Sequence, residues 1–416
     1  MIASTAHLEF HVKILQEMHL KRHVAELCAK ATYKIQGTDE DVFDVYAELQ
    51  QNLDLSIKEV MRFDVAGVAD INRALIAEQM SVIESGNPPG VITGLKRVDK
   101  VTNGWQKSDL IILAGRPGMG KTAFAVTILL QPAINDGDPV AIFSLEMSKK
   151  QLVGRIQAQI TGLNVSRIIK KQLTIEEAQL LEKNTMLLNN APIFIDDTPS
   201  LSLIELKSKA RKLVREDKVK LIIIDYLQLM RSGINTNSRE NEIAEISRGL
   251  KAIAKELDIP VIALAQLSRA VELRGGDKKP MLSDLRESGQ IEQDADMVAF
   301  CYRPEYYGIM DYELEMTNYS ADGLFMLIIA KHRNGSLGEM PLRFTKEIAR
   351  VANHDNDVSD NSYTFVQIID GKEVKQELPP KMSPNKEFES ETTDPSKVKS
   401  DDTESWMNDD EDDLPF

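Results

Sequence analysis

A glycine-rich segment that follows an apolar run carries the plainest chemistry in this chain. Residues Leu110–Ala114 are apolar throughout, which predicts a buried strand. They lead into the pattern G-x-x-x-x-G-K-T, typical of a loop whose backbone amides surround phosphate oxygens. In such a loop the lysine meets the β- and γ-phosphates of a nucleotide, and the threonine hydroxyl meets Mg²⁺. The predicted nucleotide-binding residues are Gly115, Arg116, Pro117, Gly118, Met119, Gly120, Lys121 and Thr122.

Three polar residues, Asp225, Glu146 and Gln266, each come directly after a run of apolar residues. In an open parallel sheet, ligands bind at the carboxyl ends of the strands, so these side chains are expected near the phosphate loop. Asp225 would hold Mg²⁺ opposite Thr122, and Glu146 would act as general base toward the attacking water. Gln266 would sense the γ-phosphate. The alternatives are a helix-capping aspartate, a surface glutamate and a glutamine satisfied by backbone groups.

Two cations, Lys331 and Arg333, end another apolar run. Residues two apart on a strand point to the same face, and two adjacent cations are costly unless an anion meets them. A phosphate bound by a neighbouring subunit would fit an arginine-finger role. A solvated pair at a sheet edge is an equally good interpretation of position alone.

A polar stretch, Arg269–Ile291, follows the strand that ends in Gln266. Long polar loops of this kind are usually functional or disordered. The stretch holds five Lys or Arg and four Asp or Glu, so it is no basic patch. A nucleic-acid contact here would use a few phosphates and backbone amides, as at Ser288 and Gly289.

Bulk composition narrows the class of protein. The 416 residues carry a formal charge of −15, but residues 380–416 contribute −8 of it, so net charge decides nothing about a nucleic-acid partner. The two cysteines, Cys28 and Cys301, lie too far apart for a zinc ribbon, and they indicate a reducing cytoplasm. No apolar run reaches about 18 residues and the start is no signal peptide, so we expect no membrane association.

The elements that must position these residues follow an α/β pattern. Seven short apolar runs alternate with helical stretches between residues 91 and 355, which predicts a parallel sheet covered on both faces. Before it lie a small all-helical domain, residues 1–64, and a linker helix with a hinge, residues 65–90. After it come an extension, residues 356–379, and an acidic tail, residues 380–416, that cannot bury a core and is expected to be disordered.

The ordered motifs resemble those of the DnaB-type replicative DNA helicases of bacteria and their phages. The resemblance covers roughly residues 5–350. It rests on TGLKRVDKVTNGW, LAGRPGMGKT, FSLEMSKKQL, IIIDYLQLM, ALAQLSR, SDLRESGQIEQDAD and KHRNGSLGEMPLRF. It implies a RecA-like motor domain that assembles as a homo-hexameric ring, binds ATP at subunit interfaces and moves 5′-to-3′ on single-stranded DNA in the central channel.

The resemblance also assigns roles to residues. Lys121 and Thr122 match the phosphate and metal ligands, Asp225 the acidic metal residue, Glu146 the catalytic base and Gln266 the sensor. Lys331 and Arg333 match the pair inserted from the adjacent subunit, and residues 65–83 match the linker helix that docks on a neighbouring motor domain. The residues that match the DNA-gripping loop are Arg286, Glu287 and Gly289.

Two parts of the chain depart from the family pattern. The helical N-terminal domain is short and corresponds to the second part of the family's domain, which bears on the family's N-terminal collar and on docking of primase. Primase and a helicase loader are the partners that the resemblance implies. The end of the tail, Asp409–Phe416, is similar to the acidic tip of bacterial single-stranded-DNA-binding proteins. We therefore expect Leu414, Pro415 and Phe416 to dock in an apolar pocket with basic surroundings on a replication partner, with a solubilising tail as the alternative.

Two rival functions share parts of this pattern. A RecA/RadA-like recombination ATPase has the same core, but the absent zinc cysteines, the helical N-terminal domain and SDLRESG disfavour it. A non-motor scaffold that binds ATP and DNA is disfavoured because Lys121, Glu146, Asp225 and Arg333 occur together. The sequence thus favours an ATP-hydrolysing DNA helicase.

Overall fold

The computed structural model describes residues 5–37, 41–60, 67–85, 88–232, 238–354, 365–369 and 372–376. The predicted acidic tail, with Leu414, Pro415 and Phe416, lies outside these residues. Within them, no helix is both long and apolar enough to cross a bilayer.

In the described part of the chain before residue 88 there are three helices. Helices α1 (Thr5–Gly37) and α2 (Val42–Val60) pack against each other, with Leu27, Ala31 and Val45 among the buried side chains. Helix α3 (Val68–Ser85) is different, because its large apolar side chains are exposed. Those side chains are Val68, Ile71, Leu75, Ile76, Met80 and Ile83.

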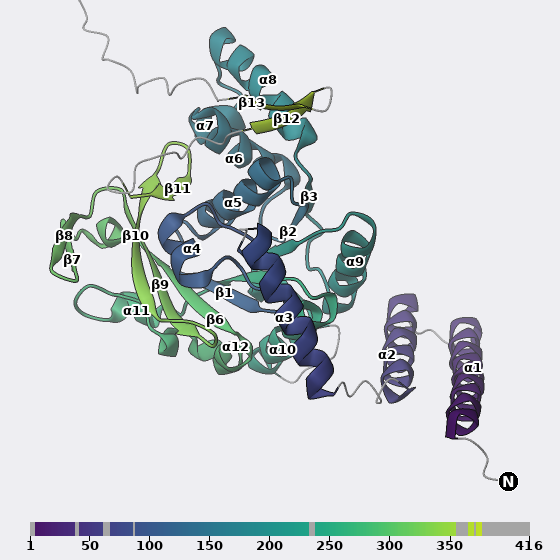
Figure 1. The fold of residues 1–416 in the computed structure, drawn as a ribbon. Coiled ribbons are helices and arrows are strands. Elements are labelled where there is room, and N and C mark those ends of the chain that lie inside the picture. The colour runs from purple at the N-terminus through teal and green to yellow at the C-terminus, as the bar shows by residue number, and fades with distance from the viewer. Residues whose placement is uncertain are drawn as a thin grey trace, which may run out of the picture. The chain divides into compact units, whose positions relative to one another are not determined.

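A nine-stranded sheet forms the centre of residues 88–354 (Figure 1). From one edge to the other the strands are β11 (Arg350–Asn353), β10 (Gly338–Thr345), β9 (Leu324–His332), β6 (Met297–Tyr302), β1 (Leu110–Gly115), β5 (Val261–Gln266), β4 (Leu221–Asp225), β2 (Val140–Ser144) and β3 (Ile193–Asp196). The six strands from β6 to β3 are mutually parallel, whereas β9, β10 and β11 continue the sheet in antiparallel pairs.

The central strands are buried on both faces, as the apolar runs predicted. Along β1, Ile111 and Leu113 belong to one core, while Leu110, Ile112 and Ala114 belong to the other. This alternation follows from the two-residue period of a strand.

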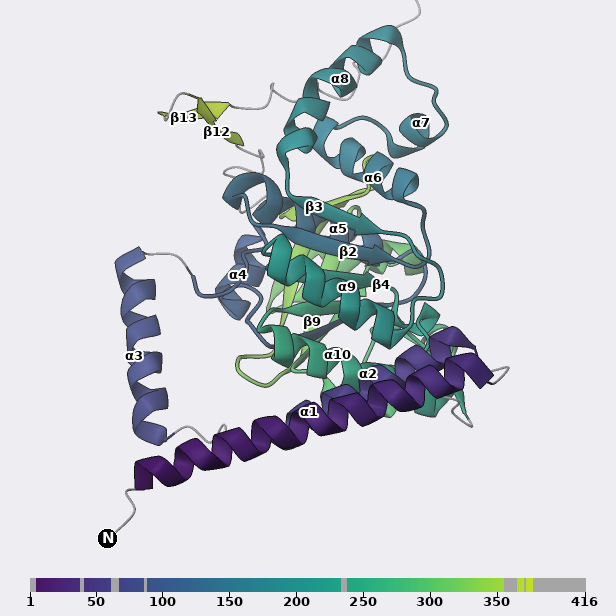
Figure 2. The ribbon, with the colours of Figure 1, turned by 90° about the vertical axis from the view of Figure 1, so that its right-hand side faces the viewer.

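Helices cover both faces of the sheet (Figures 1 and 2). The core on one face includes residues of α4 (Lys96–Thr102), α5 (Lys121–Gln131), the π-helical η1 (Pro132–Asp136) and α6 (Lys149–Thr161). The core on the other face includes residues of α9 (Leu203–Glu216), α10 (Arg239–Leu257), α11 (Ala270–Leu273) and α12 (Gly289–Asp294).

The remaining elements complete the described chain. The helical ones are α7 (Val165–Ile169), α8 (Ile175–Asn190), and the 3₁₀ turns η2 (Leu227–Leu229), η3 (Leu282–Ser288) and η4 (Pro304–Tyr307). Two hairpins lie outside the main sheet, formed by β7 (Asp311–Leu314) with β8 (Thr317–Ser320) and by β12 (Phe365–Ile369) with β13 (Lys372–Gln376).

The predicted α/β architecture is confirmed, with two corrections. All seven apolar runs form strands, but the strand that ends near Lys331 is antiparallel to its neighbour β6, so the sheet is mixed at that side. The stretch Arg269–Ile291 is not a structureless loop, because α11, η3 and the start of α12 lie within it. Both differences concern residues that carry predicted functions.

Candidate nucleotide site and its remote cations

The phosphate loop has the backbone that its glycines permit. Gly118 and Gly120 have φ angles of 79° and 88°, in the left-handed region where residues with a Cβ are strained. Gly115 is required for another reason, since a Cβ there would come within 2.9 Å of the Cys301 carbonyl oxygen on β6. Helix α5 starts at Lys121, directly after the loop, so its amino end faces the space that the loop surrounds.

Lys121 lies over the loop and binds its backbone. Its Nζ donates to the carbonyl oxygens of Gly115, at 2.7 Å, and Arg116, at 3.2 Å. Burial lowers the pKa of Lys121, an effect opposed by Cys301, Asp225 and Glu146. The ammonium therefore stands beside two carboxylates and is free to exchange carbonyl oxygens for phosphate oxygens.

Asp225 and Thr122 meet although they are far apart in the sequence. Strand β4 brings Asp225 to the sheet edge, where its Oδ2 accepts a hydrogen bond from the Thr122 hydroxyl at 2.8 Å. Burial raises the pKa of Asp225, and the nearby charge of Glu146 raises it further, while Thr122 and Lys121 oppose the rise. A buried carboxylate beside a hydroxyl and a second carboxylate fits a hard divalent cation such as Mg²⁺.

Glu146 is exposed and lies two residues beyond the end of β2. Leu145, next to it, donates its backbone N–H to the Asp225 carbonyl oxygen at 2.7 Å, which ties the two strand ends together. Ser148 then caps α6 in a reciprocal arrangement with Gln151. The capping residue is thus Ser148, which leaves the Glu146 carboxylate available at the mouth of the site.

Gln266 ends β5 next to Gly115, its partner in the sheet register. Its backbone is held by Gln228, which is not among the predicted site residues. The Gln228 side chain accepts from the Gln266 N–H and donates to the Gln266 carbonyl oxygen, both at 3.1 Å. Gln228 is a lone polar residue in the apolar segment after Asp225, and that isolation was the available signal.

Two buried arginines fix the phosphate loop, one from within the loop and one from η4's amino end. Arg116 donates to the Leu267 carbonyl oxygen at 2.7 Å and to Glu272 of α11 at 2.9 Å, which joins the loop to the segment after Gln266. Arg303 donates to the Gly118 carbonyl oxygen at 3.0 Å and lies over the Phe344 ring. Sequence spacing gave no indication of Arg303, because its role depends on a contact with a loop 185 residues away.

Lys331 and Arg333 lie far from this site in their own chain. The phosphate loop follows the carboxyl end of β1, whereas Arg333 lies level with the other end of β1, where Asp296 contacts both Leu110 and Arg333 through backbone hydrogen bonds. Six residues of strand β1 separate the two edges, which corresponds to about 17 Å. Within one chain the two cations therefore do not reach the phosphate loop.

The predicted DNA-contacting residues fall at the junction of η3 and α12. Arg286 and Glu287 lie in η3, but their side chains are outside the described part of the chain. Gly289 is the first residue of α12 and is exposed. The structure thus brings Lys121, Thr122, Asp225, Glu146 and Gln266 to one sheet edge, and leaves the predicted cation pair and DNA segment elsewhere.

Comparisons with known proteins agree with this geometry. Residues 90–353 match the model of the DnaB-like helicase C terminal domain. The chain is 41% identical to the replicative DNA helicase DnaB of Geobacillus stearothermophilus, over 85% of this chain and 76% of that protein. It is 38% identical to the replicative DNA helicase DnaC of Bacillus subtilis, over 86% of this chain and 78% of that protein.

Solved structures give the same result. A structure described as a DnaB-like replicative helicase and its interactions with primase aligns with a TM-score of 0.65 at 34% identity, over 85% of this chain and 81% of that one. A second solved structure, described as an ATPase domain, aligns with a TM-score of 0.61 at 39% identity, over 68% of this chain and 99% of that domain.

Proposed function

The chain belongs to the family of DnaB-like replicative helicases, and from this premise we propose that it unwinds duplex DNA 5′-to-3′ by ATP-driven translocation on single-stranded DNA as a ring. The observation that carries the proposal is the convergence of Lys121, Thr122 and Asp225 with Glu146 at the sheet edge, on the motor fold of this family. A protein that only stores nucleotide would not need a second carboxylate at this place.

In this proposal the phosphate loop holds the triphosphate of ATP, and Lys121 leaves the Gly115 and Arg116 carbonyl oxygens to bind the β- and γ-phosphates. Thr122 and Asp225 would hold Mg²⁺, which neutralises charge that develops on the phosphates. Glu146, next to that pair but exposed, is placed to accept a proton from the attacking water. Gln266, fixed through Gln228, senses the γ-phosphate.

Because Lys331 and Arg333 cannot reach their own phosphate loop, each subunit would supply them to a neighbour. Such a head-to-tail contact closes into a ring when the rotation between subunits allows, and a ring of six is the family expectation. The exposed apolar side chains of α3 support its role as a linker helix that docks on a neighbouring motor domain.

Single-stranded DNA would pass through the ring channel and bind at Arg286, Glu287 and Gly289. Primase and a helicase loader are the expected partners. The acidic tail would add a partner through Leu414, Pro415 and Phe416. The protein would act in the cytoplasm of a bacterium or of a phage-infected cell.

A strand-displacement assay on forked DNA tests the proposal. We expect displacement that depends on ATP and Mg²⁺ and on a free 5′ single strand, and that Lys121→Ala abolishes. Strand exchange between homologous duplexes without fork unwinding would support a recombination ATPase instead. Binding of ATP and DNA with no displacement and no hydrolysis would leave a non-motor scaffold.

A further inference from the structure

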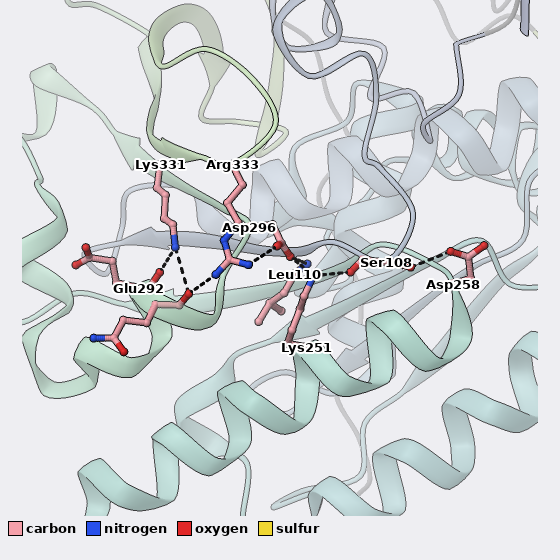
Figure 3. A network of polar contacts seen from close by, with 9 residues as sticks. Ser108, Leu110, Lys251, Asp258, Glu292, Asp296, Lys331 and Arg333 are labelled. Carbon is pink, nitrogen blue, oxygen red and sulfur yellow. Dashed lines mark hydrogen bonds and ion pairs between the residues drawn. The ribbon is translucent and has the colours of Figure 1, made fainter. Parts of the chain in front are cut away.

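A buried carboxylate at the edge opposite the phosphate loop joins three elements of the motor domain (Figure 3). Asp296 precedes β6, and its side chain is only 6% exposed. Its Oδ2 accepts from the Leu110 backbone N–H of β1 at 2.8 Å and from Lys251 of α10. Its Oδ1 accepts from the Arg333 guanidinium at 3.2 Å. The same residue also binds the Arg333 backbone, since its carbonyl oxygen accepts the Arg333 N–H at 2.9 Å.

The cation pair also holds the end of a helix. Lys331 Nζ donates to the carbonyl oxygens of Glu292, at 2.5 Å, and Gln293, at 3.3 Å, while Arg333 donates to that of Gln293 at 2.7 Å. Glu292 and Gln293 lie in the last turn of α12, where carbonyl oxygens lack partners within the helix and cations are favourable. Figure 3 shows both side chains reaching from their strand end toward this turn.

Helix α12 is the direct continuation of η3, the segment that contains Arg286. A phosphate that approached Lys331 and Arg333 from a neighbouring subunit would compete with the Glu292 and Gln293 carbonyl oxygens for the same N–H donors. The Arg333 side chain is 48% exposed and its guanidinium carries five N–H donors, so one can meet such a phosphate while another stays on Asp296.

We propose that Asp296 is a positioning residue that anchors Arg333 between the end of α12 and the nucleotide of the neighbouring subunit, so that the state of that nucleotide is passed to the segment that carries Arg286. The inference rests on the proposed function, because it needs ATP hydrolysis at a shared site. It adds the residue that holds Arg333, and the contacts with α12 through which Lys331 and Arg333 would act on the segment that carries Arg286.

The test replaces the carboxylate by its neutral isostere. In Asp296→Asn we expect the kcat for ATP hydrolysis with single-stranded DNA to fall about tenfold to a hundredfold, as misplacement of a positioned group does. The KM for ATP should stay within about twofold, because the phosphate loop lies at the other edge. The stimulation of hydrolysis by DNA should shrink in the same proportion as kcat.

A matched control separates positioning from stability. Lys251→Met removes the other cation on Asp296 but leaves its contacts with Arg333 and Leu110. We expect thermal unfolding to show a loss of stability in both variants, but DNA-stimulated kcat to fall only in Asp296→Asn. An equal fall in kcat in both variants, or none in either, would overturn the inference.

A double variant tests the route through Arg333. If Asp296 acts through Arg333, then Asp296→Asn should lower kcat no further in an Arg333→Ala background. A further tenfold fall in that background would show an independent role and would refute the inference. If the unmodified protein lacks DNA-stimulated hydrolysis altogether, the proposed function fails; if it has it and Asp296→Asn keeps it, only the inference fails.

Discussion

Each of the two edges of the sheet holds a lysine on backbone carbonyl oxygens close to a buried carboxylate, but the carboxylates differ in how they are paired. At the phosphate-loop edge, Lys121 covers carbonyl oxygens of its own loop, and the pKa of Asp225 is raised because burial disfavours its charge. At the opposite edge, Lys331 also covers carbonyl oxygens, those of α12, but the buried carboxylate there is paired with two cations. The first edge thus gains from an added cation and phosphate, whereas the second must give up existing contacts to meet a ligand.

From this difference we expect the phosphate-loop edge to determine nucleotide affinity and the opposite edge to determine the kcat for hydrolysis. In the proposed mechanism, groups at the phosphate-loop edge contact the nucleotide before and during hydrolysis. In the same mechanism, groups at the opposite edge would reach a neighbour's nucleotide only after they exchange their contacts with α12, so their effect should fall on turnover. Substitutions at the two edges should therefore differ in their effects on nucleotide affinity and on kcat.

The largest effects are expected from one cation at each edge. Lys121→Ala should lower ATP hydrolysis by about a thousandfold or more and weaken nucleotide binding, because it removes the donor to the β/γ-phosphates. Arg333→Ala should lower hydrolysis by about a thousandfold but leave binding of a fluorescent nucleotide within about twofold. Lys107→Ala, at an exposed lysine, is the control.

Mixed rings sharpen the contrast. Arg333→Ala subunits added to unmodified subunits should suppress hydrolysis more than in proportion to their share, since each one disables the site of a neighbour. Isolated Arg333→Ala monomers that hydrolysed ATP at the normal rate would show that the residue does not act on another subunit.

A middle-sized effect is expected from Gln228→Ala. The change removes both hydrogen bonds to the Gln266 backbone, so the Gln266 side chain loses its fixed position beside Gly115. We expect kcat to fall about tenfold with little change in nucleotide affinity. Gln106→Ala, which also removes side-chain hydrogen bonds to backbone carbonyls but at a different site, should leave kcat unchanged. An equal fall in both would assign the effect to stability.

The smallest expected effect is a change in how stability depends on pH, and it arises at the edge opposite the phosphate loop. Burial, and then the charge of Asp296, raises the pKa of Asp109 to about 6, although Lys251, His332 and Arg333 oppose the rise. Between about pH 4 and pH 6 the folded protein therefore keeps a proton that the unfolded chain has lost. Stability from this group is greatest at low pH and is lost as the pH rises through 6.

Asp109→Asn should remove this loss of stability at higher pH, because an asparagine side chain does not ionise. At pH 7 we expect the Tm to rise by about 2–4 °C, and the decline in stability between pH 4 and pH 6 should become shallower. Asp258→Asn, at an exposed aspartate with a left-handed backbone that asparagine tolerates, should change neither. Thermal unfolding between pH 4 and pH 7 tests this prediction. A lower Tm for Asp109→Asn than for the unmodified protein at pH 7 would contradict it.

Much of the molecule could be predicted from local sequence. Unbroken apolar runs such as Leu221–Ile224 are strands because both of their faces are buried, and they deliver Asp225 to the edge where the phosphate loop lies. The loop itself was visible from the spacing of Gly115, Gly120, Lys121 and Thr122, and Gly120 has the left-handed backbone that only glycine adopts freely. These features depend on residues adjacent in the chain, so pattern alone reveals them.

The rest depends on contacts between distant segments. The contact of Gln228 with Gln266 exists only because β4 and β5 are neighbours, and that of Asp296 with Arg333 only because the ends of β1, β6 and β9 meet. The antiparallel direction of β9 follows from its pairing with β6 and β10, which its apolar composition does not encode. The helices within Arg269–Ile291 were missed because its residues are mostly polar.

The two cysteines offer a practical consequence for fluorescence work. Cys301 is buried beside the phosphate loop, and burial raises the pKa of its thiol to about 12, so little thiolate forms at neutral pH. Cys28 on α1 is exposed. A maleimide dye at pH 7 should therefore attach to Cys28 alone, and the unmodified sequence already provides a single labelling position per chain for energy-transfer measurements.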